Sequence, residues 1–357
     1  MMISEEKLNF IITGWNMKNK SGQMAGGDEV MSIKILNPGA MTTVQDEGRF
    51  GYMDSGISES GAMDKNSYRK ANYLVGNKKG EAALEITLMG PEVLFDKDTV
   101  FGYMGAEMDA TLDGEKVSRG KAYLAKSGQS LKFGFAKNGI RAYLAFAGGV
   151  DVPIVLGSRS TNIKCEIGGY KGRKLQAGDI LDTGDVRYSS HKIRRVLKRK
   201  ATPQKYNSEI EVRVILGPQD DYFTENGMID FFNTSYKVST DIDRMGIRLD
   251  GKAIEANAST DIVSDGITFG SIQVTSSGMP IILMADHQTT GGYAKIATVV
   301  SEDLQFLAQA RPGDIIRFKQ VDIADVQKWN FLDLLTSIYE ANPRLEMIYY
   351  PEAIHAR

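Results

Sequence analysis

Cysteine, histidine and long apolar runs are scarce in this sequence of 357 residues. The single cysteine, Cys165, excludes an intrachain disulfide and any cysteine-rich zinc site. The three histidines stand far apart in the chain, so we expect no histidine metal centre. No apolar run approaches the roughly 20 residues of a membrane-spanning helix. These absences predict a cytoplasmic protein without a metal site of its own and without a membrane partner.

An excess of charge of either sign is also missing. Lys and Arg number 43 and Asp and Glu number 45, so the formal net charge is −2. This balance gives no electrostatic reason to expect nucleic acid as a partner. The sequence also lacks the phosphate loop G-x-x-x-x-G-K-[ST], the zinc motif H-E-x-x-H and the nucleophile motif G-x-S-x-G. Conventional nucleotide-binding, zinc-protease and esterase functions are therefore excluded.

Composition divides the chain into five segments. The predicted division is an N-terminal extension or mis-called start (residues 1–30), a first domain (31–190), a basic linker (191–209), a second domain (210–319) and a C-terminal helical tail (320–357). The linker is basic without interleaved aromatic residues, which favours a solvated segment over a phosphate or nucleic-acid site. In the tail, 0/3/4/7 spacing predicts an amphipathic helix with apolar positions at Phe331, Leu334, Leu335 and Ile338.

Short apolar runs bounded by turn-forming residues predict a mainly β first domain. The runs are Ile33–Leu36, Ala83–Leu88, Val100–Met104, Ala122–Ala125, Leu131–Phe135 and Arg141–Phe146. Asp113 and Gly114 predict a two-residue hairpin turn. One helix is expected between Ala62 and Gly76, because glycine is the residue that most often ends a helix.

The second domain shows the same pattern of short strands. Strands are expected at Glu211–Leu216, Gly246–Leu249, Ile281–Met284 and Ile315–Phe318. A helix is expected near Glu302–Ala310. Asp220 or Asp221 is a candidate N-cap for a short helix that runs through Phe231.

A short motif recurs in the two domains. Gly178-Asp179 and Gly313-Asp314 each precede an apolar strand, and Gly128-Gln129 is a weaker third copy. The recurrence hints that the chain contains two related, barrel-type halves.

Polar clusters within glycine-rich turns of the first domain are candidates for binding an anion. Arg49 has paired N–H donors that suit a carboxylate or phosphate, and Asp46 could hold it in orientation. The helix start near Ser60 and Asp64 offers N–H groups that attract anions. A structural Asp–Arg pair and simple helix capping are the alternatives. The predicted substrate- or phosphate-binding residues of this domain are Gln45, Asp46, Arg49, Ser60, Asp64, Ser158 and Arg159.

In the second domain the segment ADHQTTGGYAK directly follows an apolar strand. A turn needs only two or three residues, so this many polar groups favours a functional site. We predict that Asp286, Gln288 and Lys295 are catalytic, in acid–base or carboxylate-binding roles, and that His287 is a hydrogen-bonded structural residue. The other predicted substrate- or phosphate-binding residues are Asp220, Arg244, Asp265, Gln273, Thr289, Thr290, Gly291, Gly292 and Tyr293.

The motifs occur in a distinctive order: TTVQDEGRFGY, SGAMD, ANYLVGN, ALEITLMGP, AYLAFAGGVDVPIVLGSRST, GPQDDYF, DIDRMGIRL, SDGITFGSIQV and ADHQTTGGYAKIATV. Over about Met31–Lys319 the chain thereby resembles the biotin-dependent carboxyltransferase or KipA-like family. This family includes the C subunit of 5-oxoprolinase and the second subunit of allophanate hydrolase. The resemblance implies a mainly β fold of two cyclophilin-like β-barrel domains with a few short helices.

The resemblance also implies a role in a heteromeric enzyme. The expected role is that of the C subunit in an ATP-dependent 5-oxoprolinase, which acts with KipI-like (B) and LamB/YcsF-type (A) subunits to open 5-oxoproline to L-glutamate. ATP with Mg is the expected cofactor of the assembled complex, and the chain alone is expected to be inactive. Arg49 and Arg159 would then bind the substrate carboxylate or ATP phosphates, while Lys295 would stabilise developing negative charge.

Two alternatives remain open. The chain could be the carboxyltransferase component of a biotin-dependent urea or allophanate system. Biotin would then be supplied by another chain, because no Met-Lys-Met segment for biotin attachment is present. It could instead be a non-catalytic, KipA-type antagonist of a kinase inhibitor.

Overall fold

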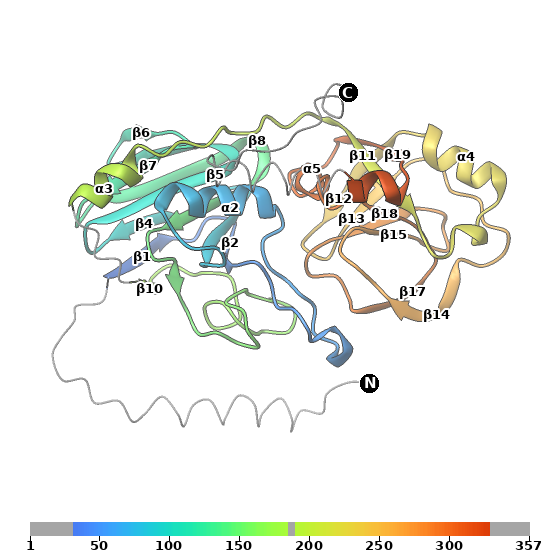
Figure 1. The fold of residues 1–357 in the computed structure, drawn as a ribbon, viewed down its shortest axis with the longest axis horizontal. Coiled ribbons are helices and arrows are strands. Elements are labelled where there is room, and N and C mark those ends of the chain that lie inside the picture. The colour runs from blue at the N-terminus through green and yellow to red at the C-terminus, as the bar shows by residue number, and fades with distance from the viewer. Residues whose placement is uncertain (1–30, 185–189, 329–357) are drawn as a thin grey trace, which may run out of the picture.

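The computed structural model describes residues 31–184 and 190–328, which form two β assemblies that lie side by side (Figure 1). The first half contains a 10-stranded sheet, and the second half contains a closed barrel. Two barrel-like sheets with few helices confirm the predicted fold class. The predicted N-terminal extension and the apolar positions of the predicted tail helix lie outside the described residues.

The first half is built from ten strands. They are β1 (Met31–Asn37), β2 (Met41–Gln45), β3 (Ala83–Thr87), β4 (Glu92–Phe95), β5 (Thr99–Leu112), β6 (Glu115–Val117), β7 (Ala122–Ala125), β8 (Ser130–Phe146), β9 (Val150–Asp151) and β10 (Ile180–Thr183). The sheet order is β2–β3–β8–β4–β1–β10–β9, and β5 pairs with β6, β7 and β8. Apolar residues such as Ile33, Phe95 and Phe146 fill the core that the curved sheet encloses.

Strands β5 and β8 are longer than the sequence predicts. The apolar runs predict separate strands on either side of Asn138-Gly139, but the structure joins them into the single 17-residue strand β8. Gly139 has a φ of +75°, and the pairing with β5 continues past it through several register shifts. A bulge therefore bends the strand where the sequence resembles a turn. The hairpin at Asp113 and Gly114 is confirmed, because both residues have positive φ between β5 and β6.

Helix α2 (Lys65–Val75) follows the short 3-10 helix η1 (Met53–Ser55) and confirms the helix predicted here. The Asp64 side chain caps its start by accepting a hydrogen bond from Ser67 N at 2.9 Å. Gly76 ends it in the left-handed conformation. Its buried face, which includes Tyr68 and Leu74, packs on β5 and β8.

The segment predicted to be a basic linker contains helix α3 (Ser190–Leu197). Val196 on this helix is buried with residues of α2, and Arg199 donates a hydrogen bond to the Tyr73 carbonyl at 2.6 Å. Farther along, Tyr206 N donates to Asn138 Oδ1 at 3.0 Å. The segment therefore runs along the first half before it reaches the second (Figure 1).

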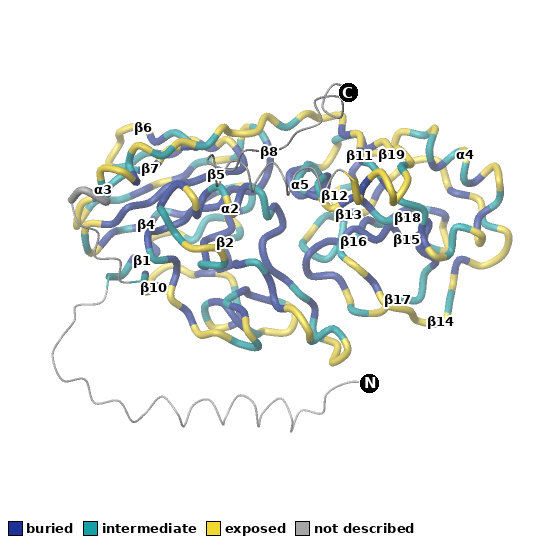
Figure 2. The backbone as a smooth tube through the Cα atoms, in the orientation of Figure 1, coloured by how far each residue is buried: buried dark blue, intermediate teal, exposed yellow. Residues whose placement is uncertain are grey.

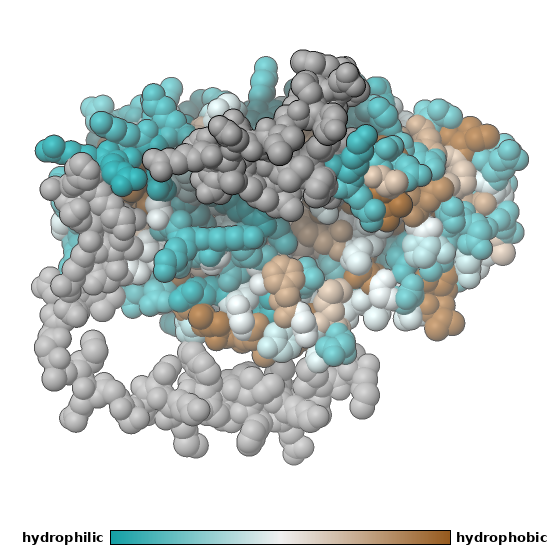
Figure 3. Space-filling view, viewed as in Figure 1, coloured by the Kyte–Doolittle hydropathy of each residue, from teal (hydrophilic) through white to brown (hydrophobic). Residues whose placement is uncertain are grey.

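The second half contains β11 (Glu209–Leu216), β12 (Tyr236–Ile242), β13 (Gly246–Asp250), β14 (Asp261–Gly266), β15 (Ser271–Val274), β16 (Pro280–Leu283), β17 (Thr290–Tyr293), β18 (Lys295–Val299) and β19 (Ile315–Gln320). The barrel order is β11–β18–β15–β16–β13–β12–β19, and it closes because β19 pairs in parallel with β11. Strands β14 and β17 pair only with each other and form a separate ribbon. Figure 3 shows hydrophobic side chains on the surface near this ribbon and α4 (Glu225–Asn233), which carry the exposed Val263 and Ile229.

Two helix predictions for the second half are corrected by the structure. Asp220 lies in the 3-10 helix η2 (Asp220–Tyr222), and the N-cap of α4 is Thr224, whose hydroxyl accepts from Gly227 N at 2.9 Å. The helix expected at Glu302–Ala310 is only α5 (Leu304–Leu307), because the following residues form tighter turns, with Gln309 N bonded to the Phe306 carbonyl.

The recurring motif forms the same kind of turn at all three positions. Asp179 and Asp314 each accept a hydrogen bond from the backbone N–H three residues earlier, at 2.7 and 2.8 Å. Gln129 makes the equivalent bond to Lys126 N at 2.8 Å. The glycine of each turn has a φ between +85° and +94°, which explains why glycine recurs there.

Burial is deepest within the two sheets and where the halves meet (Figure 2). Each half has its own apolar core. Met63, which belongs to the first half, is packed into the core of the second. The contact between the halves is therefore built into the hydrophobic cores, and it positions the polar groups described next.

Candidate functional site

A buried ionic network joins the two halves through Arg244, in the turn between β12 and β13. Asp243 shapes this turn by accepting hydrogen bonds from the backbone N–H groups of the two residues that follow Arg244. The Arg244 guanidinium donates to Asp286 at 2.8 and 3.0 Å, to Glu85 Oε1 at 2.5 Å and to the Gly61 carbonyl at 2.7 Å. Two predicted site residues, Arg244 and Asp286, are thus paired with each other and with the first half.

Glu85 is the acidic centre of this network and is almost fully buried. Its Oε2 accepts from Met63 N at 2.9 Å and from the Tyr143 hydroxyl at 2.8 Å. Burial alone would raise the pKa of Glu85, but the positive charges of Arg244 and Arg141 together with the hydrogen bonds from Met63 N and Tyr143 hold the pKa below its usual value. Glu85 is therefore ionised, and both of its carboxylate oxygens accept hydrogen bonds from donors within the protein.

Asp64 and Gln309 extend the network. Gln309 Nε2 donates to Asp64 Oδ2 at 2.8 Å, and Gln309 Oε1 accepts from the backbone N–H groups of Ile140 and Arg141 at 3.0 and 2.9 Å. Asp64 N donates to the Tyr143 hydroxyl at 2.7 Å. We call Asp64, Glu85, Arg244, Asp286 and Gln309 the interdomain network, because each member bonds across the boundary between the halves or supports a residue that does.

A second cluster in the first half surrounds Asp46. Its Oδ1 accepts from the Ser158 hydroxyl at 2.7 Å, from Gly48 N at 2.9 Å and from the Ser160 hydroxyl. Its Oδ2 accepts from Arg159 N at 2.6 Å. The structure thus brings Asp46 together with Ser158 and Arg159, as one cluster of predicted residues.

Arg49 lies beside this cluster but does not pair with Asp46. It is fully buried, and its guanidinium donates to the carbonyls of Val155 and Ser160 at 3.0 and 2.8 Å. Burial lowers the pKa of Arg49, while the nearby Asp46 acts in the opposite direction. The predicted pairing of Asp46 with Arg49 is therefore wrong. The Arg49 guanidinium binds the carbonyl groups of Val155 and Ser160 instead of the Asp46 carboxylate.

The remaining predicted residues of the first half are distributed around these two clusters. The Arg159 side chain donates to the Val152 carbonyl at 3.0 Å and to Asp151 at 3.1 Å. Gln45 Nε2 donates to the Thr161 carbonyl at 3.0 Å, also within the first half. Ser60 reaches the other half, because its backbone N–H donates to the Ala285 carbonyl at 3.1 Å.

Lys295, at the start of β18, lies at the base of the β14–β17 ribbon. Its ammonium forms an ion pair with Asp265 and donates to the Gly266 carbonyl at 2.7 Å. The Lys295 side chain is 6% exposed and that of Asp265 is 52% exposed, so a buried ammonium is paired with a carboxylate that lies at the protein surface. Gln219, which belongs to the polar cluster of the predicted residue Asp220 but was not itself predicted as a site residue, accepts a hydrogen bond from Lys295 N at 3.2 Å.

A cavity of about 270 Å³ lies between the ribbon and the barrel. It brings together these predicted residues: Gln273, Gln288, Gly291, Gly292 and Tyr293. Gln273 Nε2 donates to the Tyr293 carbonyl at 3.0 Å. Thr289 and Thr290 continue the same segment, and Thr290 pairs with Gly266 in the ribbon. Asp220 lies apart from this cavity in η2.

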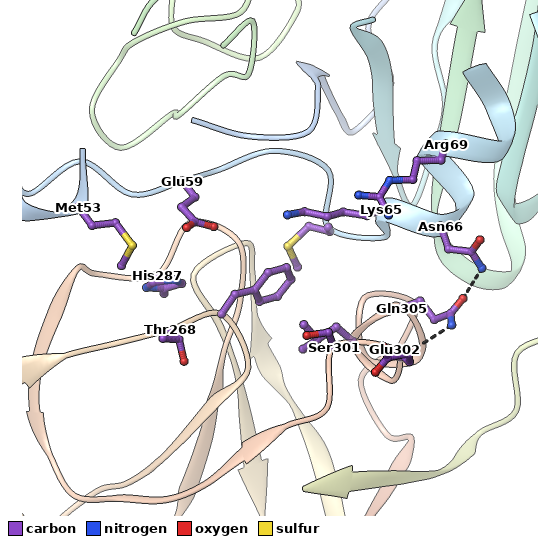
Figure 4. A pocket seen from close by; sticks show the side chains of 13 residues that line it. Met53, Glu59, Lys65, Asn66, Arg69, Thr268, His287, Ser301, Glu302 and Gln305 are labelled. Carbon is purple, nitrogen blue, oxygen red and sulfur yellow. Dashed lines mark hydrogen bonds between the residues drawn. The ribbon is translucent and has the colours of Figure 1, made fainter. Parts of the chain in front are cut away.

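The interdomain cleft is larger, with a volume of about 650 Å³, and has walls from both halves (Figure 4). His287 lines both this cleft and the ribbon cavity, and its Nδ1 lies 2.7 Å from the Gln288 carbonyl, in accord with a hydrogen-bonded role. None of the predicted site residues lines the cleft. Its polar lining consists of Glu59, Lys65, Asn66, Arg69, Thr268, Ser301, Glu302 and Gln305, together with His287.

Sequence reasoning missed the cleft residues because they come from separated segments. The available signal was a basic residue in the first turn of α2, where Lys65 stands and where acidic residues are favoured. Arg69, one turn later, is tied to Glu47 by two hydrogen bonds of 2.9 and 2.7 Å. Within residues 31–184 and 190–328, no cluster of three or more His, Cys, Asp or Glu residues is arranged to hold a metal ion.

The family model for the carboxyltransferase domain, subdomains A and B, matches residues 55–320. The chain belongs to this carboxyltransferase family. It is 39% identical over 296 residues to the C subunit of 5-oxoprolinase from Escherichia coli (strain K12), covering 83% of this chain and 93% of that protein. The predicted family is thereby confirmed.

Other members of the carboxyltransferase family are parts of much longer proteins. Urea amidolyase of Saccharomyces cerevisiae is 35% identical over 305 residues, covering 81% of this chain but 17% of that protein. The crystal structure of Kluyveromyces lactis urea carboxylase has a TM-score of 0.76 and 31% identity, covering 91% of this chain and 31% of that chain. In the described part of this family member, no helix has the length and apolar character needed to cross a membrane.

Proposed function

We propose that this chain is the C subunit of an ATP-dependent 5-oxoprolinase, which opens 5-oxoproline to L-glutamate in the cytoplasm. The observation that carries the proposal is the 39% identity to the corresponding E. coli protein over nearly the full length of that protein. The proposed partners are the KipI-like (B) and LamB/YcsF-type (A) subunits. ATP with Mg is used in the assembled complex, and the chain alone is inactive.

Opening the lactam needs an activated carbonyl group, because an amide is a poor electrophile. In the proposed reaction, ATP activates the lactam oxygen in a step carried out by this chain with its KipI-like partner, and the LamB/YcsF-type partner supplies the hydrolytic step. Lys295 is the proposed stabiliser of negative charge that develops at the substrate. Its position beside the exposed Asp265 and below the β14–β17 ribbon supports this role, since movement of the ribbon would free the ammonium.

The proposal is tested by co-expressing this chain with candidate KipI-like and LamB/YcsF-type partners from the same organism. Glutamate formation from 5-oxoproline is then measured with and without ATP. We expect ATP-dependent glutamate that disappears when this chain is omitted. A well-formed complex that makes no glutamate would contradict the proposal.

Lys295→Met tests the role of the ammonium in the same complex. We expect turnover to fall by about a hundredfold or more, as for loss of a group that stabilises transition-state charge. Gel filtration should show unchanged assembly. Lys252→Met is the matched control, because Lys252 pairs with Asp230 on the surface, and its side chain is 61% exposed. Wild-type turnover in Lys295→Met would remove Lys295 from the mechanism.

A second candidate function is biotin-dependent carboxyl transfer to a urea-like acceptor. The similarity to yeast urea amidolyase over 81% of this chain supports it. Under this proposal another chain supplies the biotin. Consumption of carboxybiotin by the purified protein, dependent on urea and independent of 5-oxoproline, would favour it over the first proposal.

A further inference from the structure

The interdomain cleft contains a lysine and a glutamate that face each other without pairing. Figure 4 shows the ammonium of Lys65 and the carboxylate of Glu59 pointing toward one another from the same wall of the cleft. Among the described residues, neither side chain forms a hydrogen bond or an ion pair, although Lys65 lies over the Phe50 ring at 5.2 Å. Arg69, another charged residue of the cleft, is by contrast paired with Glu47.

The charges around Lys65 explain why its ammonium does not pair with a neighbouring carboxylate. Glu59, Glu47 and Asp46 attract its ammonium, but Glu47 is already bound by both donors of Arg69. Arg69 in turn repels Lys65. Burial lowers the pKa of Lys65 and is the largest influence on it. Lys65 is thus partly desolvated, positively charged and without a hydrogen-bond acceptor of its own.

The position of Lys65 in α2 points in the same direction. It is the first residue of the helix, where the helix dipole disfavours a positive charge, and the only acidic group at this helix end is the N-cap Asp64, whose carboxylate is bonded to Ser67 N and Gln309. A local arrangement that weakens the helix and leaves a donor unused is typical of a site shaped for a ligand.

A donor and an acceptor on opposite sides of one gap select a particular chemical group. An anionic group placed between the two side chains would be attracted to Lys65 but repelled by Glu59 and by Glu302, which also lines the cleft. A cation would face the reverse conflict. A neutral amide with C=O and N–H on neighbouring atoms satisfies both side chains at once. In a lactam, the C=O and N–H lie on the same side of the ring, and urea presents the same two groups.

We infer that Lys65 and Glu59 bind the amide group of the substrate, with Lys65 Nζ donating to the carbonyl oxygen and Glu59 accepting the N–H. The inference rests on the proposed function for the identity of that amide, the lactam of 5-oxoproline. Lys65 then polarises the carbonyl that must be activated, and Met63 and Phe269 supply apolar walls for the ring. Lys295 does not line this cleft, so the two lysines are alternatives for the charge at the lactam oxygen, and the Lys65 and Lys295 variants distinguish them.

Protection of Lys65 from acetylation tests the inference on the full chain. The protein is treated with an amine-acetylating reagent at pH 8, and the modification of each lysine is followed by peptide mass spectrometry. Lys171 is the internal control, because its ammonium lies over the Tyr170 ring at 5.0 Å on an exposed loop outside the cleft. We expect 5-oxoproline and urea to slow acetylation of Lys65 at least threefold without affecting Lys171. Proline, which lacks the amide, and inorganic phosphate should have no effect.

Variants of Glu59 separate recognition of the N–H from general occlusion of the cleft. Glu59→Met removes the acceptor and should abolish protection by 5-oxoproline. Glu59→Gln keeps a carbonyl oxygen at the same place and should retain part of the protection. Protection by phosphate instead of the amides, or equal protection in wild type and Glu59→Met, would overturn the inference.

The active complex distinguishes failure of this inference from failure of the proposed function. In a complex that forms glutamate, Lys65→Met should raise KM for 5-oxoproline about tenfold, the effect of losing one charge-assisted hydrogen bond, while Lys171→Met leaves KM unchanged. An unchanged KM in Lys65→Met would overturn the inference and leave the reaction in place. Amide protection in a complex that makes no glutamate would support the amide site and contradict the proposed reaction.

Discussion

The interdomain network and the interdomain cleft lie at the same boundary but differ in how their polar groups are satisfied. In the network, Arg244 contacts two carboxylates and a carbonyl, and Glu85 accepts from three different donors. In the cleft, Lys65 and Glu59 have no such partners among the described residues. Groups satisfied within the protein hold the halves together, whereas unsatisfied groups beside a cavity remain available to a ligand.

Breaking the network at its centre should have the largest effect. Arg244→Met leaves Glu85 buried without its cation, and we expect the free energy of unfolding to fall by about 3–5 kcal/mol. Arg248→Met is the control: the side chains of Arg248 and Asp241 are 55% and 75% exposed, and such a pair contributes less than about 1 kcal/mol. Urea denaturation measures both variants. Equal losses would contradict the distinction between network and surface.

Substitutions of two glutamines, one in the network and one at the cleft, compare how much each region contributes to stability. Gln309→Leu removes one partner of the Asp64 carboxylate and the acceptor of two backbone N–H groups, and we expect a loss of about 2–4 kcal/mol. Gln305 bonds to Asn66 across the edge of the cleft at 2.5 Å, as Figure 4 shows, and is only half-buried. Gln305→Leu should cost about 1 kcal/mol or less. Thermal unfolding that ranks the two variants in the reverse order would refute the comparison.

The pH dependence of stability should identify Glu85 as an ionised member of the network. Burial raises the pKa of Glu85, but Arg244, Arg141 and two hydrogen bonds together lower it below the ordinary value of 4.5. Ionised Glu85 therefore stabilises the fold above about pH 4.5, and this contribution disappears as the pH falls through the lower folded-state pKa. The stability difference between wild type and Glu85→Gln should be constant from pH 7 to 5 and shrink in more acidic solution.

Substitution of Lys65 in the cleft should change the free energy of unfolding very little. Lys65→Met removes a positive charge from the start of α2, so we expect the free energy of unfolding to stay within about 0.5 kcal/mol of wild type, with any change being an increase. Differential scanning calorimetry checks this expectation. A loss of about 2 kcal/mol or more would mean that Lys65 has a structural partner, as network residues do.

Local features of the fold were predictable because they depend on neighbouring residues. The turn at Asp113-Gly114 and the helix end at Gly76 follow from backbone conformations that glycine adopts easily. The predicted N-cap of α4 was wrong because Thr224 and Asp220 are both suitable capping residues. In the structure Asp220 lies in the 3-10 helix η2, so α4 begins after Thr224.

The candidate site was less predictable because its contacts are distant in sequence. Asp46 bonds to Ser158, 112 residues away, in place of Arg49, which is three residues away. The roles predicted for these residues, and for Lys295, remain predictions. The cleft was missed because its residues come from separated segments, and a lysine in the first turn of a helix indicates a site only once its lack of a partner is seen in three dimensions.

The way each half closes has a consequence for synthesis on the ribosome. Met31 pairs with Thr183 at the ends of the first half, and Glu209 pairs with Ile315 in the second. Neither assembly can close until its last strand has left the exit tunnel, because pairing of distant segments completes each sheet. One edge of the first strand of each half must therefore wait unpaired while the intervening residues are translated. A pause in translation just before β10 or β19 would prolong exposure of these edges and favour aggregation.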